Sequence, residues 1–119
     1  MNPSALAIPC NMKPYTVAFL YPGPHYAELS DMKVPEAFAL QAKHLEGIRS
    51  NFEAGLQILA APILTPGSKL SALGVFHPHV TIEQVTEIMQ RDPVITAGRF
   101  TFEVHQAIFP SLDAVKMEY

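Results

Sequence analysis

The stretch LQILAAPILTPGSKLSALGVF, residues 56–76, decides the fold because it contains two apolar runs separated by a turn. Residues 56–64 are nearly all apolar, which predicts a strand that is buried on both faces. Residues 65–68, Thr-Pro-Gly-Ser, have the composition of a turn, and residues 69–76 predict a returning strand. Because the connection is short, the two strands are predicted to pair as an antiparallel hairpin.

The residues before this hairpin predict a long helix over residues 35–54. Pro35 suits the first turn, where the N–H that proline lacks has no helical partner. Leu45 and Ile48 belong to an apolar stripe with helical spacing. Gly55 follows as the residue that most easily adopts the left-handed end of a helix.

The residues after the hairpin predict a second helix. Thr81 and Gln84 have the spacing of a capping box, in which each residue binds the backbone of the other. The helix is expected to end near Arg91, because Pro93 disfavours helical backbone at the residue before it.

Alternating apolar side chains predict one more strand at each end of the domain, over residues 15–21 and 100–108. The order strand, helix, strand, strand, helix, strand predicts an α+β fold, an antiparallel sheet with both helices on one face. The other face would be bare in a monomer. We therefore expect a homodimer in which two such faces pair.

Length and composition indicate one domain and exclude some partners. The 119 residues are divided into a flexible N-terminal arm (1–13), the domain (14–110) and a C-terminal tail (111–119). The formal net charge is −3, and the eight Lys and Arg residues are scattered. No basic patch is present for nucleic acid or an anionic membrane, so neither is expected as a partner.

Cys10 is the only cysteine, which excludes an internal disulfide and a cysteine-based metal site. Residues 1–13 lack the charged start and long apolar run of a signal peptide. No apolar run approaches the roughly 20 residues of a membrane span. Together these features predict a cytoplasmic protein.

His77 and His79 have a spacing that can chelate a metal from one strand face. Pro78 between them favours a solvated connection instead. His25 follows a Pro-Gly-Pro turn and is expected to be exposed, whereas His105 lies on the polar side of the last strand and could line a cavity. No glycine-rich phosphate loop is present. We therefore expect neither a metal nor an organic cofactor.

His44 and Asp92 are polar residues at positions where helical spacing calls for apolar ones. His44 lies four residues after Leu40 and four before Ile48, and Asp92 lies four after Ile88. Since both predicted helices cover the same sheet face, the two side chains could meet there. A carboxylate beside a histidine stabilises the imidazolium form, and such a pair suits general acid–base catalysis.

Two simpler interpretations compete with a functional pair. A histidine beside an apolar stripe can be a core residue with satisfied hydrogen bonds. Asp92 before Pro93 also has the pattern of an N-cap followed by proline, which would start a short turn through residues 94–96. Spacing alone leaves these alternatives open.

Several blocks of the chain, in order, resemble the YciI-like family of dimeric α/β-barrel proteins. Together they span residues 15–109. The blocks are Tyr21-Pro22-Gly23-Pro24, His44-Leu45 followed by residues 55–62 with Ala60-Ala61-Pro62, residues 91–98 with Asp92-Pro93 and Ala97-Gly98, and Phe102-Glu103-Val104.

The resemblance implies a ferredoxin-like βαββαβ fold that dimerises into an α/β barrel, with an active-site pair on His44 and Asp92. The clearest activity it implies is elimination of chloride from a chlorinated hydroxyquinol, and related barrel proteins isomerise small lactones. Both reactions move a proton without a cofactor. The family's Ala-Gly-Pro is Ala60-Ala61-Pro62 here, so the methyl group of Ala61 is expected to narrow the space beside the pocket.

We therefore expect a cofactor-free lyase or isomerase acting on a small cyclic or aromatic compound. His44 would be the acid–base, Asp92 would orient it, and Tyr21 and Phe76 would contribute to the pocket wall. A non-catalytic small-molecule-binding or regulatory module is the rival interpretation, and a purely structural domain is a third. A pair that opens onto a cavity favours the enzyme. A sealed or separated pair favours the module, and the absence of a cavity favours the structural domain.

Overall fold

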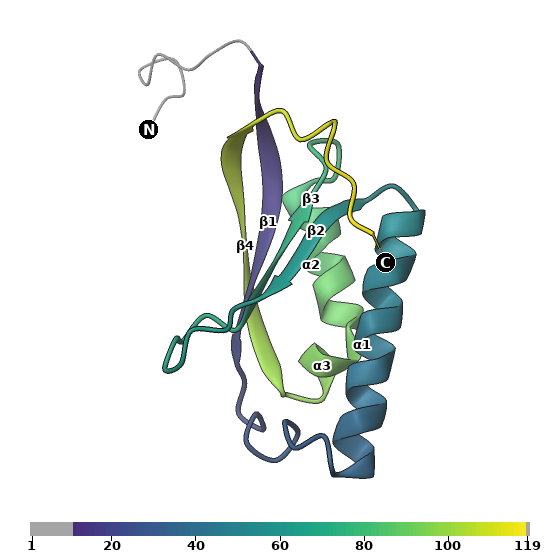
Figure 1. The fold of residues 1–119 in the computed structure, drawn as a ribbon, viewed down its shortest axis with the longest axis vertical. Helices are drawn as coiled ribbons and strands as arrows, with labels where there is room; N and C mark the ends of the chain where they lie inside the picture. The colour runs from purple at the N-terminus through teal and green to yellow at the C-terminus, as the bar shows by residue number, and fades with distance from the viewer. Residues whose placement is uncertain (1–10, 119) are drawn as a thin grey trace.

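The computed structural model describes residues 11–118, which contain four strands and three helices (Figure 1). Cys10 and residues 1–10 of the expected arm lie outside the described residues. The elements are β1 (Met12–Pro22), α1 (Pro35–Glu53), β2 (Gln57–Pro62), β3 (Ala72–Phe76), α2 (Ile82–Arg91), α3 (Pro93–Thr96) and β4 (Phe100–Pro110).

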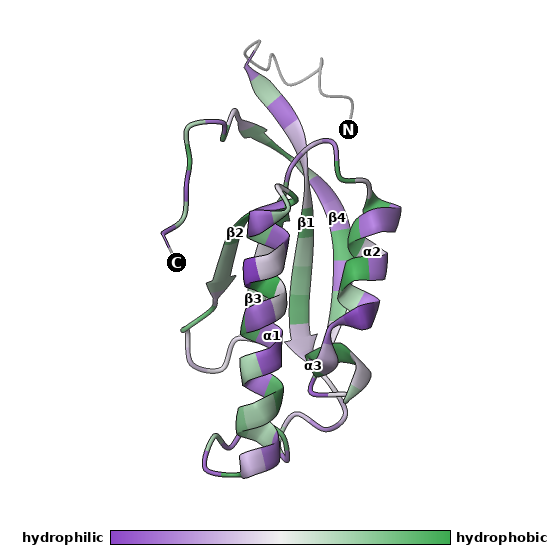
Figure 2. Ribbon diagram, turned by 90° about the vertical axis from the view of Figure 1, so that its right-hand side faces the viewer, coloured by the Kyte–Doolittle hydropathy of each residue, from purple (hydrophilic) through white to green (hydrophobic). Residues whose placement is uncertain are grey.

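The strands form one antiparallel sheet in the order β2-β3-β1-β4. The two long helices, α1 and α2, lie side by side on one face of this sheet (Figure 2). The sheet order and the shared helix face confirm the ferredoxin-like α+β fold. No helix within residues 11–118 is long and apolar enough to cross a membrane.

Strand β1 begins earlier than the sequence predicted. Met12 and Lys13, which we assigned to the N-terminal arm, pair with Pro110 and Phe109 of β4. They extend the sheet because β4 runs far enough to supply their partners. At the other end, Pro22 also belongs to the strand and lies opposite Phe100, one residue beyond the predicted range of 15–21.

Strand β2 corrects a prediction about burial. The prediction that β2 is buried on both faces is wrong, because only its first two residues, Gln57 and Ile58, are buried. Among residues 11–118 it pairs with β3 alone and lies at the edge of the sheet. The apolar run was a correct signal for a strand, but it does not show how many layers cover that strand.

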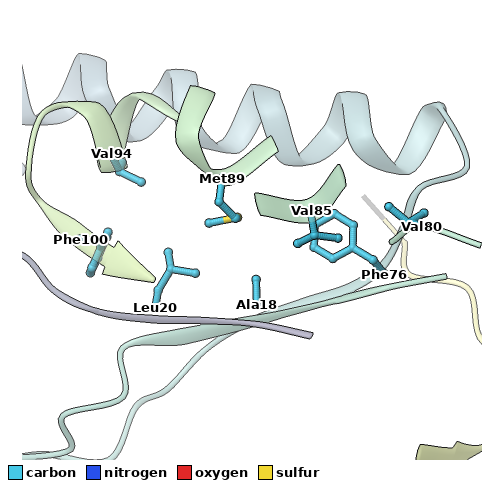
Figure 3. Packing of buried hydrophobic residues seen from close by; sticks show 8 residues of the cluster. All are labelled: Ala18, Leu20, Phe76, Val80, Val85, Met89, Val94 and Phe100. Atoms are coloured by element: carbon cyan, nitrogen blue, oxygen red, sulfur yellow. The ribbon is translucent and has the colours of Figure 1, made fainter. Parts of the chain in front are cut away.

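The main core lies between the sheet and α2. Phe76, Val85 and Val94 are almost fully buried there, and Figure 3 shows Val85 and Met89 above Ala18 and Leu20 of β1. The capping box predicted for α2 is present. The Gln84 N–H donates to Thr81 Oγ1 at 3.1 Å, and the Thr81 N–H donates to Gln84 Oε1 at 2.8 Å. The capping box predicted from the sequence and the burial of Val85 and Met89 therefore both fix helix α2 against the sheet.

The opposite face of the sheet is partly covered by the chain's own C-terminal segment, which differs from the bare face we expected. Leu112 packs against a cluster that includes the buried residues Tyr15 and Val17, and its N–H donates to the Tyr15 hydroxyl at 2.7 Å. Further on, Met117 Sδ accepts the N–H of Ala60 in the edge strand β2 at 3.3 Å. The tail thus folds back along β2, while the β1–β4 part of the face retains exposed side chains.

Candidate active site

Helix α1 positions His44 above the sheet without filling the space beneath it. Of its nineteen residues only Ala37 is buried. Leu45, part of the predicted apolar stripe, is 48% exposed. A cavity of about 200 Å³ therefore remains between this helix, the sheet and α2, lined by apolar groups such as Leu20, Ile48 and Met89.

Asp92 is held at the junction of α2 and α3. Its backbone is extended, with φ −65° and ψ 127°, and it ends α2 and caps α3. Asp92 Oδ1 accepts the N–H of Val94 at 3.0 Å, and Pro93 occupies the first helical position. The interpretation of Asp92 as an N-cap is confirmed.

The predicted pair also forms. His44 Nδ1 lies 2.7 Å from Asp92 Oδ2, and the two side chains are only 13% and 14% exposed. The two roles considered for Asp92 are compatible because each uses a different oxygen. The cap thus holds the carboxylate group in the position from which it contacts the histidine.

The contact with the carboxylate determines which nitrogen of His44 is left to act as a base. An ionised carboxylate only accepts hydrogen bonds, so a hydrogen bond from His44 to Asp92 Oδ2 requires the N–H to be on Nδ1, while Oδ1 accepts the N–H of Val94. The proton of neutral His44 then resides on Nδ1. Nε2 keeps its lone pair, and it has no hydrogen-bond partner within residues 11–118. Both His44 and Asp92 line the cavity.

The two predicted wall residues have different outcomes. Phe76 is 1% exposed and lines the cavity. Tyr21 does not, because strand side chains alternate: its neighbour Leu20 faces the helices, so Tyr21 faces the opposite side of the sheet with Thr101. The prediction that Tyr21 walls the same pocket as His44 is wrong for this reason.

Polar residues that we did not single out form part of the cavity lining. Gln57 Oε1 accepts from Asn51 Nδ2 at 3.2 Å, and Gln57 Nε2 donates to the carbonyl of Leu59 at 3.0 Å. This side chain lies over Gly74, where an added Cβ would come within 2.9 Å of Gln57 Nε2. The available signal was a glutamine inside an otherwise apolar strand. Ala61, which stands where the YciI-like pattern has glycine, also lines the cavity.

The other histidines lie outside this cavity. The His77 and His79 rings stack with centroids 5.5 Å apart, and burial together with the nearby His79 lowers the pKa of His77. His25 pairs with Glu28 on the surface. Within residues 11–118, no group of three or more His, Cys, Asp or Glu side chains is arranged to hold a metal.

His105 lies on the face of the sheet away from the helices, next to Phe19. It is exposed and lies 3.2 Å from Glu103 Oε2. It does not line the cavity that contains His44.

A second cavity adjoins the first. It has a volume of about 380 Å³ and also has His44 in its wall, together with Gln41, Leu20, Pro62 and Ala72, which line both spaces. The His44 imidazole therefore lies where the two cavities adjoin. The first cavity is mainly apolar, and the second has more polar groups in its wall.

The fold and the site define an α+β protein of ferredoxin-like topology with a partly buried His–Asp pair in a cavity beside the sheet. The sequence matches no family model and no curated protein. Among solved structures, the chain is similar to the 5-chloro-2-hydroxyhydroquinone dehydrochlorinase TftG of Burkholderia phenoliruptrix, solved in complex with 2,5-dihydroxybenzoquinone. The TM-score is 0.56 at 15% sequence identity, and the match covers 76% of this chain and 90% of the dehydrochlorinase chain. At this identity the likeness concerns the fold.

Proposed function

We propose that this protein is a cofactor-free acid–base enzyme of the lyase or isomerase type that acts on a small cyclic or aromatic compound. The observation that carries the proposal is the 2.7 Å contact between His44 Nδ1 and Asp92 Oδ2 at the wall of an apolar cavity of about 200 Å³. A His–Asp pair that opens onto a cavity favours an enzyme over a non-catalytic module, and both His44 and Asp92 line this cavity.

His44 acts as the base through Nε2, the nitrogen that Asp92 does not engage. It removes a proton from an activated carbon or hydroxyl of the substrate, and Asp92 stabilises the imidazolium that forms. In an elimination, the electron pair of the broken C–H or O–H bond moves through the ring system and expels the leaving group, while the proton stays on His44. In an isomerisation, His44 returns the proton to another atom of the same molecule.

A structural likeness and a sequence resemblance, which point to the same family of proteins, support this reaction class. The fold is shared with a dehydrochlorinase whose structure contains a small dihydroxybenzoquinone. The resemblance of residues 15–109 to the YciI-like family implies the same kind of proton transfer and puts the active pair on His44 and Asp92. A non-catalytic binding module would use the same cavity, so only turnover separates the two proposals.

The test is a screen of small phenols, quinones and lactones, followed by a double-mutant cycle on any compound that is converted. His44→Ala and Asp92→Asn should each lower kcat/KM by about 10²–10⁴-fold. The double variant should lose little more than either single variant, because the residues act as one unit. Asparagine caps a helix about as well as aspartate, so Asp92→Asn retains the cap on α3.

His79→Ala, which removes an exposed histidine that lines neither cavity, is the matched control and should retain activity. Near-normal turnover in Asp92→Asn would contradict a catalytic pair. Tight binding of screened compounds with no conversion of any of them would favour the non-catalytic module.

We also propose that two copies associate through the sheet face opposite the helices. Phe19 and Leu73 are only partly buried there in one chain, and the tail covers the other end of the face. Sedimentation at micromolar concentration should give twice the chain mass of 13.1 kDa. Phe19→Asp should shift the protein toward the monomer, since it would bury a charge in the interface. A wild-type protein that sediments as a monomer would rule out this association.

A further inference from the structure

Arg99 is a cation in the wall of the second cavity that the sequence analysis did not single out. It lies between Gly98 and Phe100, directly before the last strand, and is partly buried. It lines the same cavity of about 380 Å³ as His44. Burial lowers the pKa of the Arg99 guanidinium, since removing the charge from water disfavours the protonated form.

The neighbours of this guanidinium are neutral. Arg99 Nη1 donates a hydrogen bond to Gln41 Oε1, Nε donates to Ser30 Oγ at 3.4 Å, and the guanidinium carbon lies 4.8 Å from the centre of the Phe100 ring. No carboxylate lies within ion-pair distance of Arg99 among residues 11–118. This is unusual for a chain with eleven acidic residues and eight basic ones, because a partly desolvated cation is normally paired.

The guanidinium retains hydrogen-bonding capacity toward a ligand. Arginine has five N–H donors, and two of them are engaged, so three have no protein partner within residues 11–118. These are one N–H on Nη1 and both on Nη2. Such a fork is suited to a carboxylate or another anionic oxygen.

The backbone that carries Arg99 is fixed in place. Gly98 has φ +79°, a conformation that favours glycine, and its carbonyl accepts the N–H of His25 at 2.8 Å. The Arg99 carbonyl accepts the N–H of Gly23 at 2.8 Å, and a Cβ on Gly23 would lie only 2.3 Å from the Gly98 carbonyl oxygen. The turn at Gly23 therefore packs tightly against Gly98 and fixes the backbone from which the Arg99 side chain extends.

Gln41 connects this cation to the proposed catalytic histidine. Gln41 and His44 are three residues apart on α1, so they are neighbours on one helix face, and both line both cavities. The residue that anchors the guanidinium is thus one helical turn from the imidazole. Because His44 and Arg99 line the same second cavity, a small ring bound at His44 shares that space with the guanidinium.

From this arrangement we propose that the substrate carries an anionic oxygen, as a carboxylate or a phenolate, which Arg99 binds while His44 transfers the proton. The inference rests on the proposed function, because it names the substrate class for the same site. Arg99 is the residue that would select an ionised ring compound over a neutral one of the same shape.

The test compares matched ligands without requiring turnover. The affinity of the wild-type protein is measured by NMR titration for two pairs of ligands, each an anion and a neutral compound of similar shape. The pairs are benzoate with benzamide, and pentafluorophenolate with pentafluoroanisole. We expect the anion of at least one pair to bind about tenfold or more tightly than its neutral partner. The pair that shows this preference identifies carboxylate or phenolate as the recognised group. Equal affinity within both pairs would overturn the inference.

Variants separate recognition from a purely structural role of Arg99. Arg99→Gln should abolish the preference for the anion. Arg91→Gln, the same change at an exposed arginine of α2 that pairs with Glu87, should retain it. Gln41→Glu provides a second route that leaves Arg99 in place, because the new carboxylate would pair with the guanidinium and also abolish the preference. An anion preference that survives in both Arg99→Gln and Gln41→Glu would refute the assignment.

The outcome is independent of the proposed chemistry. His44→Ala should still prefer the anion, since it leaves Arg99 and Gln41 unchanged. If the anion preference is found but no compound is converted, the enzyme proposal fails and the anion site stands. If conversion depends on His44 but no preference is found, only the assignment of Arg99 fails.

Discussion

Helices α1 and α2 cover the same face of one sheet, yet they use their side chains differently. In α2, Val85 is 0% exposed and Met89 is 6% exposed, and both pack against the main core (Figure 3). In α1, Phe38 is 63% exposed and only Ala37 is buried. The comparison shows that one half of the sheet face is packed for stability, whereas the other half leaves a cavity.

The candidate active site lies at the boundary between these two halves. The packed half supplies Asp92, which is fixed by its cap on α3. The open half supplies His44 from a helix that leaves room beneath it. An acid–base pair needs both properties, because one group must be held in place while the other must be accessible to a ligand.

The largest expected effect comes from matched truncations in the two helices. Met89→Ala should lower the free energy of unfolding by about 2–3 kcal/mol. The variant removes a buried side chain, and the neighbouring core residues cannot fully fill the space that it leaves. Leu45→Ala removes a side chain of similar size that is already 48% exposed. It should cost about 1 kcal/mol or less. Urea unfolding of both variants and the wild type, with the slopes compared, provides the measurement.

Leu45 lines the cavity, so Leu45→Ala should enlarge the space beside His44 while leaving the protein folded. Equal destabilisation by the two variants would mean that α1 is packed as tightly as α2. That result would remove the basis of the comparison.

A smaller effect is expected at the beginnings of the same two helices. Thr81 caps α2 through a complete capping box, whereas Val34 precedes α1 and makes no side-chain cap. Thr81→Ala should therefore cost about 1 kcal/mol of stability, and Val34→Ala should change it by less than about 0.5 kcal/mol. Thermal unfolding of the two alanine variants under one buffer condition measures the difference. A loss at Val34 as large as that at Thr81 would show that α1 depends on its first turn in a way the cap geometry does not indicate.

Much of the fold could be predicted because its signals are local. A capping box, a proline at a first helical turn and a glycine at a helix end each act within a few residues, and all three lie where the sequence indicated. The order of the elements then restricts the topology to very few choices. The errors concerned the burial of β2, the two ends of β1 and the sheet face that the tail covers, because burial and pairing depend on segments that are distant in the chain.

The site was predictable only in part. His44 and Asp92 stood out because each interrupts an apolar stripe, and the resemblance added weight to both. Phe76 lines the cavity that contains His44, whereas Tyr21 does not, and alternation along a strand does not say which face the helices cover.

The sequence by itself determined the element order, the helix caps and the positions of two polar residues within apolar patterns, because these follow from local backbone preferences and side-chain periodicity. Only the tertiary structure decided that Asp92 both caps α3 and contacts His44, that the tail covers β2, and that Arg99 lies against Gln41 with no carboxylate of residues 11–118 within ion-pair distance. The contacts between His44 and Asp92, between Gln41 and Arg99, and between Ala60 and Met117 join residues that are 48, 58 and 57 positions apart. Such distances in the chain are closed by packing the helices on the sheet, and no local pattern records them.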